Sequence, residues 1–98
     1  MITVIRTTTF IPGKTEAFAI ANEIAKQASR VLGRPVRVGT PIGANLNGIC
    51  WIAQFDSLAQ MEEGMSKIPG DAQYMAAVKS AEGVWVPGSL QEQLFRTN

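Results

Sequence analysis

Hydrophobic residues along this chain follow two spacings, and the change from one to the other divides the chain into elements. Alternating apolar and polar positions rich in β-branched residues are typical of strands, whereas apolar residues recurring every three or four positions are typical of helices. Pro-Gly pairs and single glycines interrupt the pattern where turns are expected. The pattern predicts strands at 2–11, 35–43, 48–55 and 89–96, and helices at 14–32, 57–68 and 72–81.

The two later helices carry recognisable start signals. Ser57 followed by Gln60 forms a capping-box pattern, and Asp71 is a suitable N-cap for the shorter helix. In the shorter helix, Met75 and Val78 are expected to turn inward. The helix at 57–68 has one apolar face, which is made of Leu58, Met61, Met65 and Ile68.

The order of the elements predicts a fold class. Strand, helix, strand, strand, helix, strand is the split βαβ order of ferredoxin-like folds, an α+β class with a four-stranded antiparallel sheet and helices on one face. A chain of 98 residues is expected to form a single domain, 1–98. Strands 2–11 and 48–55 carry apolar side chains at both parities, so the helix-free face also needs cover. A homodimer formed sheet against sheet would provide it.

Charge and cysteine content argue against several partners and compartments. Lys plus Arg is 9 and Asp plus Glu is 8, a net charge of +1, which does not favour nucleic acid or an anionic membrane as a partner. Cys50 is the only cysteine and cannot form an internal disulfide. No signal peptide or apolar stretch of membrane-spanning length is recognisable, so the expected location is cytoplasmic.

The chain contains no histidine, which narrows the chemistry. Histidine is the commonest metal ligand and the usual proton shuttle near neutral pH, and it activates serine and cysteine nucleophiles. No Walker or dinucleotide-binding glycine pattern occurs, and Asp56 and Asp71 are interpreted as helix-start residues rather than a catalytic carboxylate pair. We therefore expect no metal, haem or other cofactor.

Three junctions carry a resemblance to known families. They are Phe10–Lys14 at a strand-to-helix turn, Phe55–Leu58 with Met61 and Glu62 at a second one, and Trp85–Ser89 followed by Glu92 and Leu94–Arg96. The chain resembles the dimeric α+β barrel superfamily, and within it the NIPSNAP-like and antibiotic-biosynthesis-monooxygenase-like families. The resemblance implies subunits that pair sheet to sheet. Because its motifs are structural junctions, it supports a fold more than a function.

The resemblance leaves two functions open. Members with known chemistry include cofactor-free monooxygenases and haem-degrading enzymes, and the haem-degrading type uses a histidine that this chain lacks. One hypothesis is therefore a small-molecule-binding, monooxygenase-like enzyme acting on a flat apolar substrate. The alternative is a non-catalytic oligomeric module that binds a ligand or a protein. A deep cavity with ordered polar side chains would favour the first, and a filled core the second. An RNA-binding domain of the same order is disfavoured by the missing basic flank.

Arg6 is the least expected residue, because it interrupts an apolar and threonine-rich strand. A charge there must be paired or must reach water. Glu92 is the expected partner, since the first and last strands are neighbours in this fold. The pair is either an anion anchor in a pocket or a structural ion pair.

Other candidate residues also allow more than one structural or functional role. Trp51 is either a pocket wall for a flat ligand or ordinary core. Trp85 could close the mouth of a pocket or pack on a partner subunit, and it is expected at an interface or in the core rather than on a ligand. Tyr74 is expected to be partly buried with an exposed hydroxyl. The residues that could line a ligand pocket are Arg6, Thr8, Trp51, Met61, Met65, Tyr74 and Glu92. No catalytic residue is assigned.

Overall fold

The computed structural model describes residues 1–43 and 45–97 and contains every predicted element. Most bounds are shorter than the sequence pattern predicts. The elements are strand β1 (Ile2–Thr9), helix α1 (Ala17–Leu32), strand β2 (Val36–Gly39), strand β3 (Gly48–Phe55), helix α2 (Leu58–Lys67), helix α3 (Ala72–Lys79) and strand β4 (Gln91–Arg96).

The largest differences lie beside prolines. The strand predicted at 35–43 ends at Gly39, because Pro41 has no N–H to donate to a ladder and the chain turns away there. The helix predicted from residue 14 begins at Ala17, after a tight turn that follows Pro12-Gly13, with Glu16 as its N-cap residue. Apolar spacing alone does not locate such turns.

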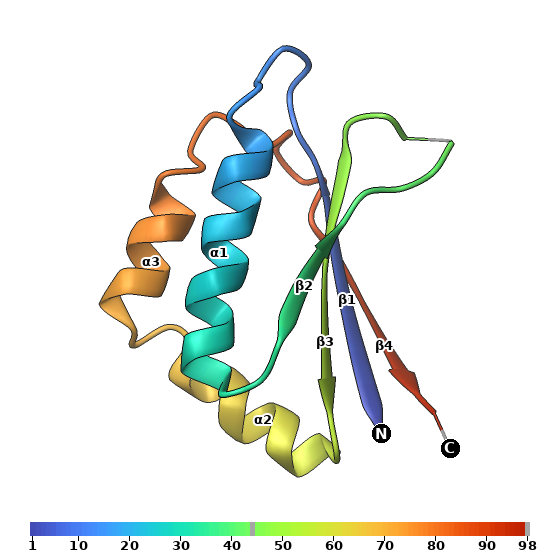
Figure 1. The fold of residues 1–98 in the computed structure, drawn as a ribbon, viewed down its shortest axis with the longest axis vertical. Coiled ribbons are helices and arrows are strands. Elements are labelled where there is room, and N and C mark those ends of the chain that lie inside the picture. Colours follow the sequence, from blue (N-terminus) through green and yellow to red (C-terminus); the bar gives the residue numbers. More distant parts are fainter. Residues whose placement is uncertain (44, 98) are drawn as a thin grey trace.

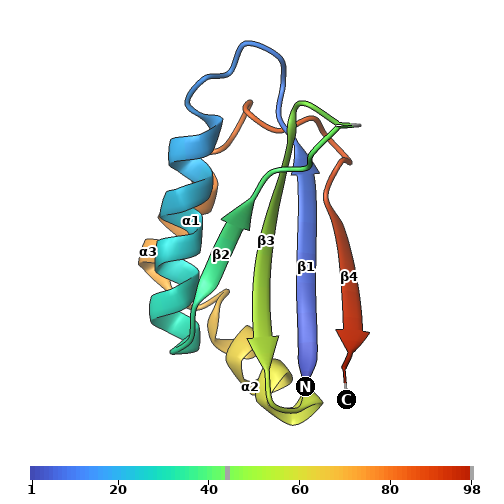
Figure 2. The ribbon, with the colours of Figure 1, turned by 45° about the vertical axis from the view of Figure 1, so that its right-hand side comes forward.

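The sheet has the order β2-β3-β1-β4 with every neighbouring pair antiparallel, as Figure 2 shows. The predicted α+β fold with a four-stranded antiparallel sheet is therefore confirmed. The register sets Arg6 of β1 opposite Trp51 of β3 on one side and opposite Glu92 of β4 on the other. Residues paired across antiparallel strands share a face, so these three side chains project from the same side of the sheet.

All three helices lie on one face of the sheet (Figure 1). On that face Val4, Ile49 and Phe55 are buried. The side of α1 that meets the sheet is built largely from alanine, which lets the helix axis lie close to the strands. The buried residues of α1 are Ala17, Ala21, Ile24, Ala25 and Ala28.

Helix α3 is rotated relative to the prediction. Its buried residues are Tyr74 and Ala77, whereas Met75 and Val78 are 45% and 36% exposed. Met75 and Val78, which were expected to turn inward, are therefore not buried in the core, because α3 packs mainly against α1 rather than against the sheet. Helix α2 has no fully buried residue, and Leu58 on its predicted apolar face remains exposed.

Within residues 1–43 and 45–97, no helix is both long and apolar enough to cross a membrane. The longest helix, α1, has 16 residues and carries a charged outer side. It is an amphipathic helix that covers a sheet.

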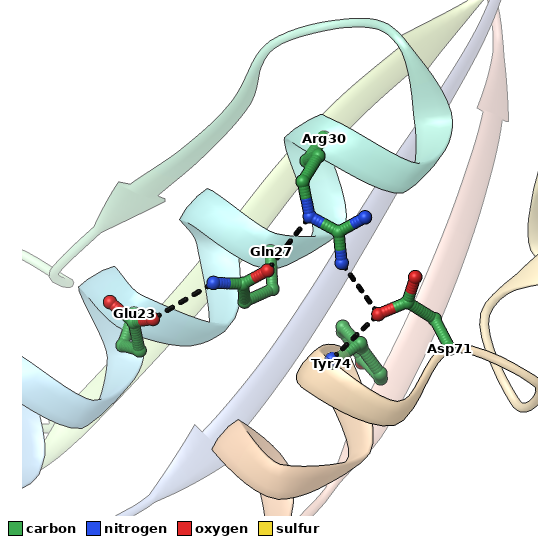
Figure 3. A network of polar contacts seen from close by, with 5 residues as sticks. All are labelled: Glu23, Gln27, Arg30, Asp71 and Tyr74. Carbon is green, nitrogen blue, oxygen red and sulfur yellow. Dashed lines mark hydrogen bonds and ion pairs between the residues drawn. The ribbon is translucent and has the colours of Figure 1, made fainter.

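One polar network ties α3 to α1, and Figure 3 shows it from close by. Asp71 Oδ1 accepts hydrogen bonds from the backbone N–H of Tyr74, at 2.9 Å, and from Arg30 Nη2 of α1. Arg30 Nε donates to Gln27, and Gln27 donates to Glu23, so the guanidinium is held in place along the helix. The predicted N-cap role of Asp71 is confirmed, with an interhelical ion pair added to it.

The Arg30 hydrogen bond, helped by the backbone N–H of Tyr74, lowers the pKa of Asp71 below its ordinary value of 3.8. A carboxyl whose pKa is lower in the folded than in the unfolded state stabilises the fold above the unfolded value. That contribution is lost as the pH falls through the lowered pKa.

We predict that thermal stability at neutral pH falls in the order wild type, Asp71→Ser, Asp71→Ala. Serine keeps a capping oxygen but loses the charge, and alanine loses both. The difference between wild type and Asp71→Ser should shrink as the pH is taken well below 3.8, where the carboxyl becomes protonated. Thermal unfolding followed by circular dichroism measures both effects. Equal melting temperatures for wild type and Asp71→Ser at neutral pH would show that the ion pair adds no stability.

Candidate functional site

A cavity of about 550 Å³ lies between the sheet and the helices. Its floor is formed by β1 and β3, its walls by α1, α3 and the end of α2, and its rim by residues 85–88 and Leu90. The residues from α1 and α3 that line it are apolar except for the hydroxyl of Tyr74, and the cavity is partly open to solvent. A space of this size and lining is typical of small-molecule sites.

Two tryptophans form an aromatic corner in this cavity. The rings of Trp51 and Trp85 meet edge to face, with centroids 5.9 Å apart and an angle of 87° between their planes. Trp51 Nε1 donates a hydrogen bond to the carbonyl oxygen of Ala21 in α1 at 3.0 Å. Its N–H is therefore already used, and the ring meets the cavity as a fixed apolar surface. Trp51 packs against the core and lines the cavity, so both of its expected roles coincide.

The predicted pairing of Arg6 with Glu92 is confirmed. Arg6 Nε donates to Glu92 Oε2 at 2.9 Å, and Arg6 Nη2 donates to the same oxygen. The two side chains are 34% and 39% exposed, so the pair is half-buried. At that exposure its net contribution to stability is small compared with the roughly 3–5 kcal/mol lost when a fully buried pair is broken. Arg6 lines the cavity, and Glu92 holds it from the neighbouring strand.

Two hydroxyl groups also reach this region. Thr8 is buried, and its hydroxyl lies 3.0 Å from that of Ser89. Tyr74 is only 9% exposed, so its ring is more deeply buried than the sequence suggested. Tyr74 lines the cavity, and within the described part of the chain its hydroxyl has no hydrogen-bond partner. A tyrosine hydroxyl without a partner can donate or accept a further hydrogen bond.

The methionines differ in where they lie relative to the cavity. Met65 lines the cavity, whereas Met61 packs against the core cluster below it, which contains Ile2, Val4, Ala53 and Phe55. Met61 is thus not brought together with the other candidates. Met75 of α3 does line the cavity and was not among the predicted site residues.

The rim was not among the predicted pocket residues, although a place for Trp85 at a pocket mouth was one of its expected alternatives. Trp85, Val86, Pro87, Gly88 and Leu90 come from a link between α3 and β4 that has no regular periodicity. A backbone bridge between Phe10 and Trp85 holds this link against the end of β1. The signal that could have found it is Trp85 itself, since a large aromatic residue in an irregular link needs a packing partner.

The chemistry available at the site is limited. Arg6 is the only charged residue lining the cavity within the described residues. No group of three or more His, Cys, Asp or Glu residues that could hold a metal occurs in the same part of the chain. Cys50 is paired with Thr7, on the helix-free face of the sheet, and so lies away from the cavity. The arrangement can hold and orient an apolar molecule, with Tyr74 and the Arg6–Glu92 pair as its polar contacts.

Neither protein-family models nor curated protein sequences match this chain. Solved structures do match it. A NIPSNAP family protein with unknown function from Agrobacterium tumefaciens superposes with a TM-score of 0.81 at 18% identity, covering 99% of this chain and 87% of that one. An uncharacterised NIPSNAP-like domain protein from Burkholderia xenovorans gives a TM-score of 0.79 at 16% identity, covering 99% and 84%.

A third similar structure belongs to a protein of described activity. SnoaB, a cofactor-independent oxygenase from Streptomyces nogalater, matches in a mutant form with a TM-score of 0.68 at 11% identity, covering 98% of this chain and 91% of that one. At such identities the likeness concerns the path of the backbone and not the residues of a site. The resemblance inferred from the sequence junctions is confirmed at the level of fold: this chain has the α+β fold seen in the NIPSNAP-like and antibiotic biosynthesis monooxygenase structures.

Proposed function

We propose that this protein binds a small, flat, apolar molecule in the cavity between its sheet and its helices. The observation that carries the proposal is the apolar cavity of about 550 Å³, which is lined by Tyr74 and by Arg6 among mainly apolar side chains. A module that only assembles with other proteins has no need of such a space, because an unfilled cavity costs stability.

The shape and surface of the cavity favour a planar ligand. Trp51 and Trp85 stand at a near right angle and offer a ring face and a ring edge. Met65 and Met75 have flexible side chains that adapt to different outlines. Burial of apolar ligand surface contributes about 25 cal/mol per Å² before the costs of association. Hydrogen bonds from Tyr74 and Arg6 then orient the ligand rather than supply most of the affinity.

A second candidate function is cofactor-free oxygenation of such a ligand. Two observations favour it: the likeness to the fold of SnoaB, and the carboxylate of Glu92, which is hydrogen-bonded to the cavity-lining Arg6. An electron-rich ring that has lost a proton can pass electrons to O₂ and form a carbon-bound peroxide. Breakage of the O–O bond leaves one oxygen on the carbon and releases the other as water, so that CH₂ and O₂ become C=O and H₂O. The cavity would exclude bulk water from this step.

We also propose that two copies pair through the helix-free faces of their sheets. Ile5 and Ile52 are cross-strand neighbours on this face, and Phe95 at its edge is 47% exposed. Among the strand residues on this face, Arg37 is the only charged one. A second copy would cover this weakly polar surface and leave the cavity, on the opposite side of the sheet, accessible.

We predict that N-phenylnaphthylamine, a flat uncharged dye, will bind with a rise in its fluorescence. Val78→Trp should weaken this binding about tenfold or more, because the larger side chain fills part of the cavity. Ala76→Trp on the same helix is the matched control, since Ala76 is exposed and does not line the cavity. Equal loss of binding in the two variants, or no binding by the wild type, would contradict the proposed site.

Oxygen consumption distinguishes the enzyme from the binding module. If the protein is an oxygenase, quinol-type compounds that bind in the cavity should consume O₂ faster than in buffer, with product carrying one oxygen atom from labelled O₂. Glu92→Gln should slow this uptake if the carboxylate takes the proton. Tight binding with no uptake above the buffer rate would favour the non-catalytic module.

For the assembly, we predict a dimer at micromolar concentration by light scattering. Ile52→Lys should shift it to a monomer, because it places an unpaired charge in the proposed interface. Ala59→Lys, at an exposed position on α2, should remain dimeric. A wild-type protein that is monomeric under these conditions would refute the pairing.

A further inference from the structure

We propose that the cavity selects uncharged ligands over anions and cations, and that Glu92 and Arg6 together set this selectivity. The inference rests on the proposed ligand-binding function and adds the charge class of the ligand. Among the residues that the structure describes, Arg6 is the only charged one that lines the cavity, and it is paired with Glu92. The inference follows from this pairing.

The pairing is built into the sheet. Arg6 and Glu92 are directly opposite in the ladder of β1 and β4, so the backbone holds their side chains on the same face. Two hydrogen bonds from the guanidinium converge on a single carboxylate oxygen. Arg96 also projects from this face of β4, but it lies opposite Ile2 at the far end of the ladder. The charge of Arg6 is therefore balanced locally by Glu92.

The pair still has unused hydrogen-bonding capacity. Within the described residues, Arg6 Nη1 and Glu92 Oε1 take part in no hydrogen bond. One is a donor and the other an acceptor. Arg6 lines the cavity, and Glu92 lies beside it on the neighbouring strand, outside the lining. A neutral hydroxyl or amide on the ligand that reaches this pair can use either group, and it brings no charge into the cavity.

A charged ligand is both attracted and repelled by the Arg6–Glu92 pair. A carboxylate that approaches Arg6 also comes close to Glu92, and an ammonium group that approaches Glu92 comes close to Arg6. Each then loses its hydration in an apolar surrounding while attraction to one partner is offset by repulsion from the other. In the described ranges 1–43 and 45–97, no other charged residue lines the cavity to tip this balance.

Three probes of one ring system test the inference at neutral pH: naphthol, naphthoate and naphthylmethylammonium, measured by calorimetry. Wild type should bind naphthol about tenfold or more tightly than either ion. Glu92→Gln leaves Arg6 unbalanced and should make naphthoate the best of the three. Arg6→Gln leaves Glu92 unbalanced and should make naphthylmethylammonium the best. Glu62→Gln, the same change on the exposed side of α2, should keep the wild-type order.

The outcomes separate this inference from the function on which it rests. If naphthol binds but naphthoate binds more tightly to the wild type, or if the order is unchanged in both Glu92→Gln and Arg6→Gln, the charge selectivity is overturned while cavity binding stands. If no probe binds to any variant, although circular dichroism shows them folded, the proposed function fails as well.

Discussion

Helix α3 packs against α1 instead of against the sheet, and the cavity is the direct result. The contact is made by Ala28 of α1 with Tyr74, Ala77 and Ala81 in and after α3, small side chains for the most part, which bring the two helices close together. Asp71 strengthens it by capping α3 and pairing with Arg30. Because α3 is held on α1, a space is left over β1 that the helix layer does not fill.

The sheet register decides what that space contains. Val4, Arg6 and Thr8 alternate with residues of the opposite face, so a single strand brings apolar, charged and hydroxyl side chains to the cavity floor. Trp51 stands opposite Arg6, and its N–H is bound to the carbonyl of Ala21. The aromatic surface and the charge are thereby set side by side, on elements that are rigid rather than on loops.

In the proposed function, one face of the sheet binds the ligand and the other face pairs two copies of the chain. The helix face holds the cavity, whereas the other face carries Ile5, Ile52 and Phe95 without a covering layer. A substitution on one face need not disturb the other, because adjacent residues of a strand point in opposite directions. The same two-faced strands would serve ligand binding and pairing of copies.

The order of elements, the antiparallel sheet and the pairing of Arg6 with Glu92 could be predicted from the sequence alone. Each depends on local periodicity, on turn residues, or on strand neighbours that the element order implies. The rotation of α3 could not, because Met75 and Tyr74 are adjacent and both large, so periodicity in so short a helix does not say which one faces inward. Nor could the cavity, since residues 85–88 and Leu90 reach it from an irregular link. The sequence by itself determined which positions are apolar or charged and how they alternate along the strands. Only the packing of α3 on α1 decided that a space would remain between the helices and the sheet.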